Sequence, residues 1–103
     1  MNNCRLKKWI KQYNIYEQTI NHFYYCLNQY MKDEKEEYEN QLGNVKKFHL
    51  EMICISYQID FPELCNERIV IDAHILGDDI NIGDFSVIYN KNGEIADEYF
   101  IIE

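Results

Sequence analysis

The sequence predicts an α+β fold in which a long N-terminal amphipathic helix packs on a curled four-stranded antiparallel sheet. Apolar residues recur at steps of three and four over residues 13–42, as on a helix that buries one side. From Val45 onwards they alternate with period two, as in strands. The dipeptide Asn92-Gly93 lies between two such runs, where it favours a hairpin turn. With 103 residues we expect one domain spanning residues 1–103, with residues 1–42 helical and residues 45–103 forming the sheet.

The helix prediction rests on a tyrosine-rich stripe. At about 100° per residue its members fall within a sector roughly 120° wide, as expected of a core-facing helix. The stripe consists of Tyr16, Ile20, Phe23, Tyr24, Leu27, Tyr30, Met31, Tyr38 and Leu42. Residues 3–12 continue its phase, and Asn2 or Asn3 can cap their start. Two arrangements therefore remain open: one helix of about 38 residues, or a short helix and a long one with a break near Asn14.

The helix is expected to end at Gly43, after the charged residues 32–39, which predict an end that projects past the sheet into solvent. The four predicted strands span residues 45–61, 68–76, 85–90 and 94–102. In the first strand the apolar side switches near Met52, so either both faces are covered or a bulge re-aims the chain. Pro62 ends this strand, and residues 63–67 connect it to the second. Residues 77–84 predict a turn-rich loop. This order of elements is similar to the helix-plus-curled-sheet architecture of cystatin-like domains, a resemblance that involves no sequence motif.

The charge of the chain is negative and unevenly distributed. Ten Lys and Arg residues against eighteen Asp and Glu residues give a formal net charge of −8. Residues 1–11 hold four basic residues and no acid, whereas residues 60–103 hold eleven acidic residues against Arg68 and Lys91. A phosphate backbone would repel the acidic half, so we expect no direct nucleic-acid binding there. A basic protein is the expected partner, although net negative charge also serves solubility.

The cysteines and the apolar runs bear on the location of the protein. The four cysteines form no CxxC pair. The N-terminal residues contain no apolar run of signal-peptide length, and no stretch approaches the ~20 apolar residues of a membrane span. These features predict a cytoplasmic protein with reduced thiols and no membrane partner.

Residues suited to metal binding or catalysis occur in incomplete sets. His22 and Cys26 lie four residues apart on the predicted helix, a spacing at which both can ligate one metal ion. Further zinc ligands would have to converge from His49, Cys54, Cys65 and His74. We therefore expect no metal and no cofactor. Asp72 and His74 share a strand face and could act as orienter and base, but a structural histidine is the stronger interpretation. With no nucleotide-binding or nucleophile motif, we expect a protein that is not an enzyme.

Six acidic residues form the candidate partner-binding site. They lie in the predicted loop and the last hairpin: Asp78, Asp79, Asp84, Glu94, Asp97 and Glu98. In the pleat of the last strand, Asp97 shares a face with Ile95 and Tyr99. Glu98 lies on the other face with Phe100. Carboxylates among aromatic residues are typical of an interface that pairs Arg and Lys and packs Tyr against them. The alternative is that these charges protect an edge strand from aggregation.

We therefore predict a non-enzymatic inhibitor whose acidic sheet and loop face blocks a basic, nucleic-acid-acting protein, with carboxylates standing in for phosphates. In size, acidity and lack of catalytic motifs the chain resembles bacterial immunity proteins that neutralise toxin nucleases and phage-encoded anti-CRISPR inhibitors. Two alternatives stay open: a cystatin-like domain that encloses a small-molecule pocket, and a homodimer whose open sheet face pairs with itself. If the acidic residues bind the partner, charge reversal at Asp78, Asp79 and Glu98 should abolish binding and leave the thermal midpoint nearly unchanged.

Overall fold

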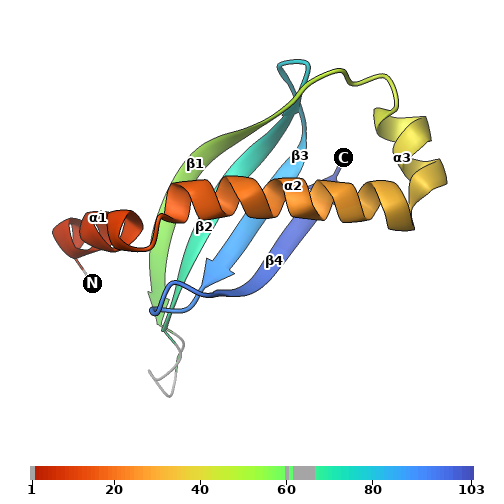
Figure 1. The fold of residues 1–103 in the computed structure, drawn as a ribbon. Coiled ribbons are helices and arrows are strands. Elements are labelled where there is room, and N and C mark those ends of the chain that lie inside the picture. The colour runs from red at the N-terminus through yellow and green to blue at the C-terminus, as the bar shows by residue number, and fades with distance from the viewer. Residues whose placement is uncertain (1, 60, 62–66) are drawn as a thin grey trace.

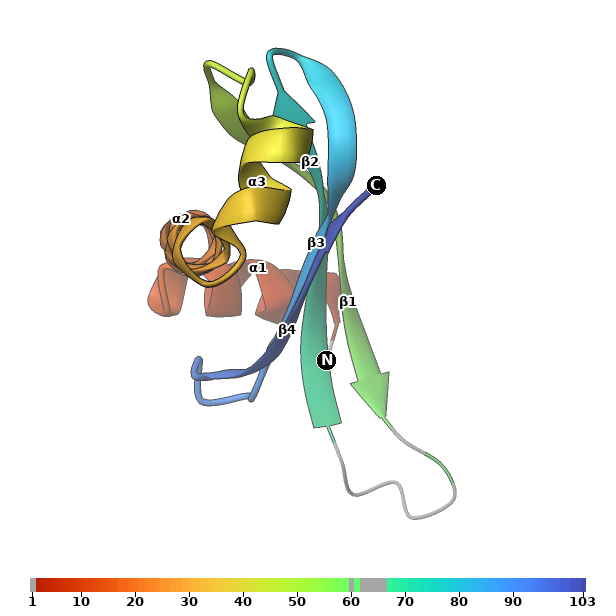
Figure 2. The ribbon, with the colours of Figure 1, turned by 90° about the vertical axis from the view of Figure 1, so that its right-hand side faces the viewer.

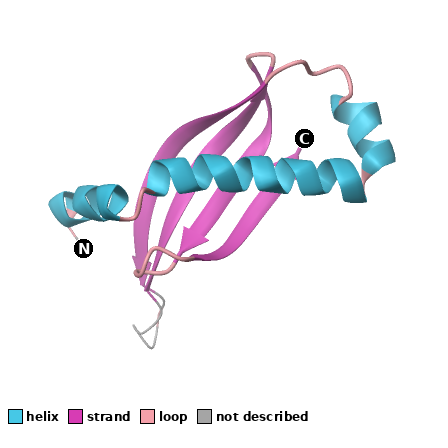
Figure 3. Ribbon diagram, in the orientation of Figure 1, coloured by secondary structure: helices cyan, strands magenta, loops and turns pink. Residues whose placement is uncertain are grey.

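The computed structural model describes residues 2–59, 61 and 67–103. Within these residues, three helices are followed by four antiparallel strands in the order β1-β2-β3-β4 (Figures 1 and 3). The elements are α1 (Asn3–Gln12), α2 (Ile15–Asp33), α3 (Lys35–Leu42), β1 (Phe48–Ile59), β2 (Glu67–Gly77), β3 (Ile80–Tyr89) and β4 (Ile95–Ile102). The sheet is not closed, so β1 and β4 are its edges. This confirms the predicted α+β fold with helices packed on a four-stranded antiparallel sheet.

The helical region is broken at Asn14, as one of the two predicted arrangements required. Asn14 has φ 54° and ψ 43°, a left-handed conformation that ends α1 and starts α2 at a new angle. Asparagine is among the few residues that tolerate this conformation. Asn2 caps α1, since its side-chain oxygen accepts a hydrogen bond of 2.9 Å from the Arg5 amide. Trp9 is buried, and its indole N–H donates to the Lys91 carbonyl at 2.8 Å, which attaches α1 to the β3–β4 connection.

A second break, which the sequence did not predict, separates α2 from α3 at Glu34. Its φ of −125° and ψ of 51° interrupt the helix, and α3 turns away from the axis of α2 (Figure 1). The charged side chains of residues 32–37 are exposed, as expected, but the chain does not continue straight to Gly43. Tyr38 packs against the core and Leu42 is buried, so the turn returns two apolar residues of the stripe to the protein interior.

The core forms between α2 and one face of the sheet, and it uses a narrower part of the helix than the tyrosine-rich stripe. The buried residues of α2 follow steps of four: Ile15, Thr19, Phe23 and Leu27. Three predicted members of the stripe, Tyr16, Tyr24 and Met31, are exposed. The prediction that they face the core was wrong because a single helix contacts the sheet along one line, and residues on either side of that line stay in solvent.

The sheet follows its predicted strands with one correction. The β1–β2 register shifts between Met52 and Cys54, so the expected change of face is a bulge. The predicted loop over residues 77–84 is instead a two-residue turn of Asp78 and Asp79, because β3 already begins at Ile80. Both turn residues have positive φ, 50° and 67°, as a tight primed hairpin turn requires. The Asn-Gly hairpin is confirmed between β3 and β4, with Gly93 at φ 83°.

Three further features relate to the predictions made from the sequence. Pro62 and residues 63–66, predicted to end the first strand and to connect it to the second, lie outside the described residues. None of the described helices combines the length and apolar character that crossing a membrane requires. Cys4, Cys26 and Cys54, the cysteines in the described residues, are free thiols.

Candidate functional site

One face of the sheet is left without a helix. In Figure 2, α2 and α3 lie on the same side of the sheet, and no described element covers the centre of the other side. Alternation along the strands sorts the side chains: β2 turns Ile69, Ile71, Ala73 and Ile75 into the core and places Asp72 and His74 opposite. We call this uncovered side the open face. Its charged side chains are Glu51 of β1, Arg68 and Asp72 of β2, Asp84 of β3 and Asp97 of β4, and the histidines His49 and His74 lie on the same side.

Two cross-strand pairs occupy the centre of the open face. His74 lies opposite Asp84 in the β2–β3 register, and its Nδ1 atom is 3.0 Å from the Asp84 carboxylate. Asp72 lies opposite Ser86, whose hydroxyl donates to the Asp72 carboxylate at 2.7 Å. The side chains of His74 and Asp84 are 39% and 46% exposed. These contacts hold two carboxylates in fixed positions while leaving acceptor oxygens available to a partner.

The arrangement does not assemble a catalytic nucleophile from the described residues. The predicted pair of Asp72 and His74 is not formed, because each makes its hydrogen bond to a different residue of β3. A serine nucleophile is usually activated by a histidine or an amine, whereas the Ser86 hydroxyl donates to the Asp72 carboxylate. The Cys54 thiol lies 3.6 Å from Asp72, and burial together with that carboxylate raises its pKa, which disfavours the reactive thiolate. The geometry suits binding of cations better than covalent chemistry.

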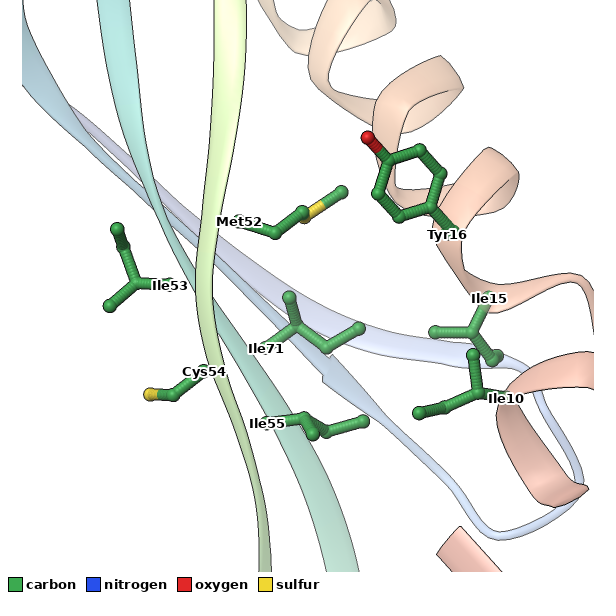
Figure 4. Close-up of a pocket in the computed structure, with 8 residues that line it drawn as sticks. All are labelled: Ile10, Ile15, Tyr16, Met52, Ile53, Cys54, Ile55 and Ile71. Atoms are coloured by element: carbon green, nitrogen blue, oxygen red, sulfur yellow. The ribbon is translucent and has the colours of Figure 1, made fainter. Parts of the chain in front are cut away.

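Exposed apolar side chains lie among these acids. Tyr99 is 54% exposed and lies opposite Ser86, and Ile101 is 53% exposed and lies opposite Asp84. On the other edge, the β1 bulge turns Ile53 and Cys54 consecutively away from the helices (Figure 4). Ile53 is half exposed. The open face thus combines fixed carboxylates with aromatic and aliphatic contact area at both edges.

The six acids predicted as the site do not form one cluster. Asp84 and Asp97 lie on the open face. Asp78 and Asp79 form the β2–β3 turn, and the Asp78 carboxylate accepts hydrogen bonds from the Lys46 and Lys47 amides at 3.2 and 3.0 Å. Asp78 therefore has a structural role of its own.

The remaining two predicted acids lie apart from the open face. Glu94 is exposed and follows the β3–β4 turn, where its amide donates to Asn92 at 3.1 Å. Glu98 lies opposite the buried Val87 and so points to the helix side of the sheet. A register shift between Ile88 and Tyr89 also places Ile95 on that side, which corrects the expectation that Ile95 shares a face with Asp97.

Glu51 and Asp72 of the open face were not among the predicted partner-binding residues. The alternation of β2 already placed Asp72 opposite the apolar residues of that strand, so this signal was available. The position of Glu51 opposite His74 depends on the β1–β2 register, which follows from the pairing of distant segments.

A small apolar pocket lies away from the open face, between β1 and the junction of α1 with α2 (Figure 4). Its volume is about 190 Å³, and the side chains of Ile10, Ile15, Met52 and Ile71 lie around it. Tyr16 of α2 borders it as well (Figure 4). Ligand sites usually measure about 300–1,000 Å³ and include a few polar groups that orient the ligand. This pocket is smaller and almost entirely apolar.

Comparisons with protein-family models, with curated proteins and with solved structures give no match for this chain. Function has therefore to be inferred from the residues of the open face and their geometry.

Proposed function

We propose that the protein is a non-enzymatic binding protein of the cytoplasm that blocks a basic protein partner with the open face of its sheet. The observation that carries the proposal is an uncovered sheet surface on which four carboxylates, those of Glu51, Asp72, Asp84 and Asp97, outnumber a single arginine. Uncovered antiparallel sheets are common, but their solvent sides usually mix charges of both signs. On the open face negative charge prevails, which complements a partner rich in Lys and Arg.

The size of the open face matches that of a protein interface. The ten residues of β3 span about 33 Å, and four strands side by side span about 19 Å. The projected area is therefore roughly 600 Å², close to the ~800 Å² that each partner contributes to a standard interface. Tyr99 and Ile101 supply apolar contacts next to the acids, the combination expected where a partner's arginine stacks on an aromatic ring while pairing with a carboxylate.

A nucleic-acid-acting protein is the proposed class of partner. Surfaces that bind phosphate backbones are rich in Lys and Arg, and carboxylates fixed on a rigid sheet can occupy the same cationic groups. Occupation would exclude the nucleic acid by steric and electrostatic blockade, in the manner of immunity proteins and anti-CRISPR inhibitors. No chemistry on the partner is required for this mechanism.

Affinity capture with matched charge variants tests the proposal. One variant reverses two open-face charges, Asp84→Lys with Asp97→Lys, and its control reverses two exposed charges on α3, Glu36→Lys with Glu39→Lys. Both change the net charge equally. We expect immobilised wild type and the α3 control to retain a basic nucleic-acid-binding protein that the open-face variant loses. Equal capture by both variants, or no such protein with wild type, would overturn the proposal.

The apolar pocket supports one second candidate, a small cystatin-like domain that binds an apolar small molecule. Its volume of about 190 Å³ admits only a few carbon atoms, so the affinity of such a ligand would be modest. Thermal stabilisation by an apolar metabolite, lost on replacement of Ile71 by Phe to fill the pocket, would favour this function. Self-association through the open face predicts instead a sedimentation coefficient that rises with protein concentration.

A further inference from the structure

A histidine, a cysteine and a glutamate converge on the helix side of the sheet. His22 and Cys26 are one helical turn apart on α2, and Glu98 reaches them from β4. The His22 Nε2 atom is 3.1 Å from the Glu98 Oε1 atom, and the Cys26 Sγ atom is 3.8 Å from the same oxygen. One ligand atom from each of the three residues lies within 4.8 Å of the other two. Among the described residues this is the one cluster of three potential metal ligands.

The separations resemble those of a tetrahedral metal centre. With Zn–N and Zn–O bonds of ~2.1 Å and a Zn–S bond of ~2.3 Å, tetrahedral angles place N and O about 3.4 Å apart and S and O about 3.6 Å apart. The observed 3.1 and 3.8 Å lie within a few tenths of an ångström of these values. The third separation, between the ligand atoms of His22 and Cys26, is at most 4.8 Å, against about 3.6 Å in such a centre, so these side chains would have to move closer together. Two ligands come from adjacent turns of a rigid helix, so little ordering is needed.

The surroundings also suit a bound cation. Glu98 occupies a strand position whose neighbours on the same side, Phe100 and Ile102, pack on the core. A positive partner would stabilise a carboxylate at such a position, since water reaches it only in part: the Glu98 side chain is 34% exposed and that of His22 is 18% exposed. The His22 ring is held in place by stacking on Tyr25, with ring centroids 5.8 Å apart. One side of the cluster remains accessible, which leaves room for an ion to enter.

We propose that His22, Cys26 and Glu98 bind a divalent transition-metal ion of the Zn²⁺ class, with the fourth position open to water. Imidazole, thiolate and carboxylate together are a donor set typical of Zn²⁺, whereas Mg²⁺ and Ca²⁺ select oxygen ligands. The ion would join α2 to the edge strand β4 and would stabilise the folded chain, because the unfolded chain has no assembled site. The site is separate from the open face, so it does not depend on the proposed function.

The competing explanation is a metal-free contact, in which the His22 ring and the Cys26 thiol both hydrogen-bond to the Glu98 carboxylate. Titration of the reduced wild-type protein with Co²⁺ distinguishes the two. A metal site predicts saturation at one ion per chain, with the intense visible bands of tetrahedral Co²⁺ and a thiolate-to-cobalt charge-transfer band. Zn²⁺ should displace the Co²⁺ and raise the thermal midpoint, and Mg²⁺ should do neither. Failure of wild type to bind Co²⁺ and Zn²⁺ under these conditions would overturn the proposal.

Matched variants then locate the site. Cys26→Ser should remove the charge-transfer band, because it removes the sulfur ligand. Both Cys26→Ser and His22→Gln should weaken Zn²⁺ binding at least tenfold, as loss of one ligand does. Cys54→Ser is the control, since Cys54 also lies beside a carboxylate but outside the cluster. It should bind as wild type does. If Cys26→Ser fails to fold by circular dichroism, Glu98→Gln tests the same point. Binding that is retained in the cluster variants, or lost in the control, would contradict the assignment.

Discussion

A buried pair of hydroxyls between α2 and β3 yields a quantitative prediction. Thr19 and Tyr89 are both 0% exposed, and their hydroxyl oxygens are 2.7 Å apart. The Thr19 hydroxyl also donates to the Ile15 carbonyl at 2.8 Å, so the Tyr89 hydroxyl must donate to Thr19. Thr19 thus has two partners and Tyr89 has one. The two residues attach α2 to the core side of the sheet.

Because Thr19 has two hydrogen-bond partners and Tyr89 has one, two conservative substitutions should lower the free energy of unfolding by different amounts. Tyr89→Phe removes one hydrogen bond and leaves Thr19 bonded to Ile15, which should lower the free energy of unfolding by about 1 kcal/mol. Thr19→Val keeps the shape of the side chain but leaves the Tyr89 hydroxyl buried without a partner. That should cost about 2–3 kcal/mol. The double variant buries no unpaired hydroxyl, so it should be more stable than Thr19→Val alone by about 1 kcal/mol or more.

Urea unfolding of wild type, the two single variants and the double variant measures these values, provided that the slope of the free energy of unfolding against urea concentration is the same in all four. The expected coupling free energy between the two sites is about 2 kcal/mol, the size seen for residues in direct contact. Additive effects, or a larger loss for Tyr89→Phe than for Thr19→Val, would refute the placement of α2 against β3.

Three further outcomes are expected. Asp78→Asn should lower the free energy of unfolding by about 1 kcal/mol, because the Lys46 and Lys47 amides then donate to a neutral acceptor in place of a charged one. Asp79→Asn should change the free energy of unfolding little in the same urea assay. Burial raises the pKa of the Cys26 thiol from 9.0 to about 11, which lowers the fraction of reactive thiolate at pH 8. Iodoacetamide should therefore modify Cys26 roughly 100-fold more slowly in the metal-free native protein than in urea, as measured by mass spectrometry. The Lys91 ammonium beside Glu67 lowers the pKa of that carboxyl, so Glu67 contributes stability above the usual Glu pKa and loses it as the pH falls through the lowered value. Glu67→Gln should therefore lower the thermal midpoint near neutral pH, and its difference from wild type should shrink in acid.

One outcome would contradict each of these three predictions. An Asp79→Asn loss as large as that of Asp78→Asn would contradict the structural role assigned to Asp78. Equal alkylation rates in the native and unfolded chains would contradict the buried environment of Cys26. A difference between wild type and Glu67→Gln that grows as the pH falls would contradict the ion pair with Lys91.

Local patterns in the sequence predicted the elements and the layer arrangement. The change of period after residue 42 and the change of face near Met52 both correspond to features of the structure, because side-chain periodicity follows directly from backbone geometry. The α1–α2 break at Asn14 was one of two predicted possibilities, and only tertiary packing decides between them. One such tertiary contact is the hydrogen bond from Trp9 of α1 to the distant Lys91 carbonyl.

Features that depend on contacts between distant segments could not be predicted. The turn of Asp78 and Asp79 places two non-glycine residues at positive φ, which local preferences disfavour. It is stabilised by amides of the segment that precedes β1. Glu98 was grouped with the binding acids because its charge was visible in the sequence, whereas its contacts with His22 and Cys26 exist only after α2 has packed on β4. Charge reversal at Asp78 or Glu98 would therefore change stability as well as binding, so Asp84 and Asp97 are the better test positions.

The most direct test of the open face as a binding surface is the association rate of the captured partner as a function of salt. For wild type and for the Glu36→Lys, Glu39→Lys control, the rate constant should fall steeply as salt screens the attraction between carboxylates and basic groups. For Asp84→Lys with Asp97→Lys it should already be low at low salt and should change little. A wild-type rate that is independent of salt, or an open-face variant that associates as fast as wild type, would contradict the proposed mode of binding.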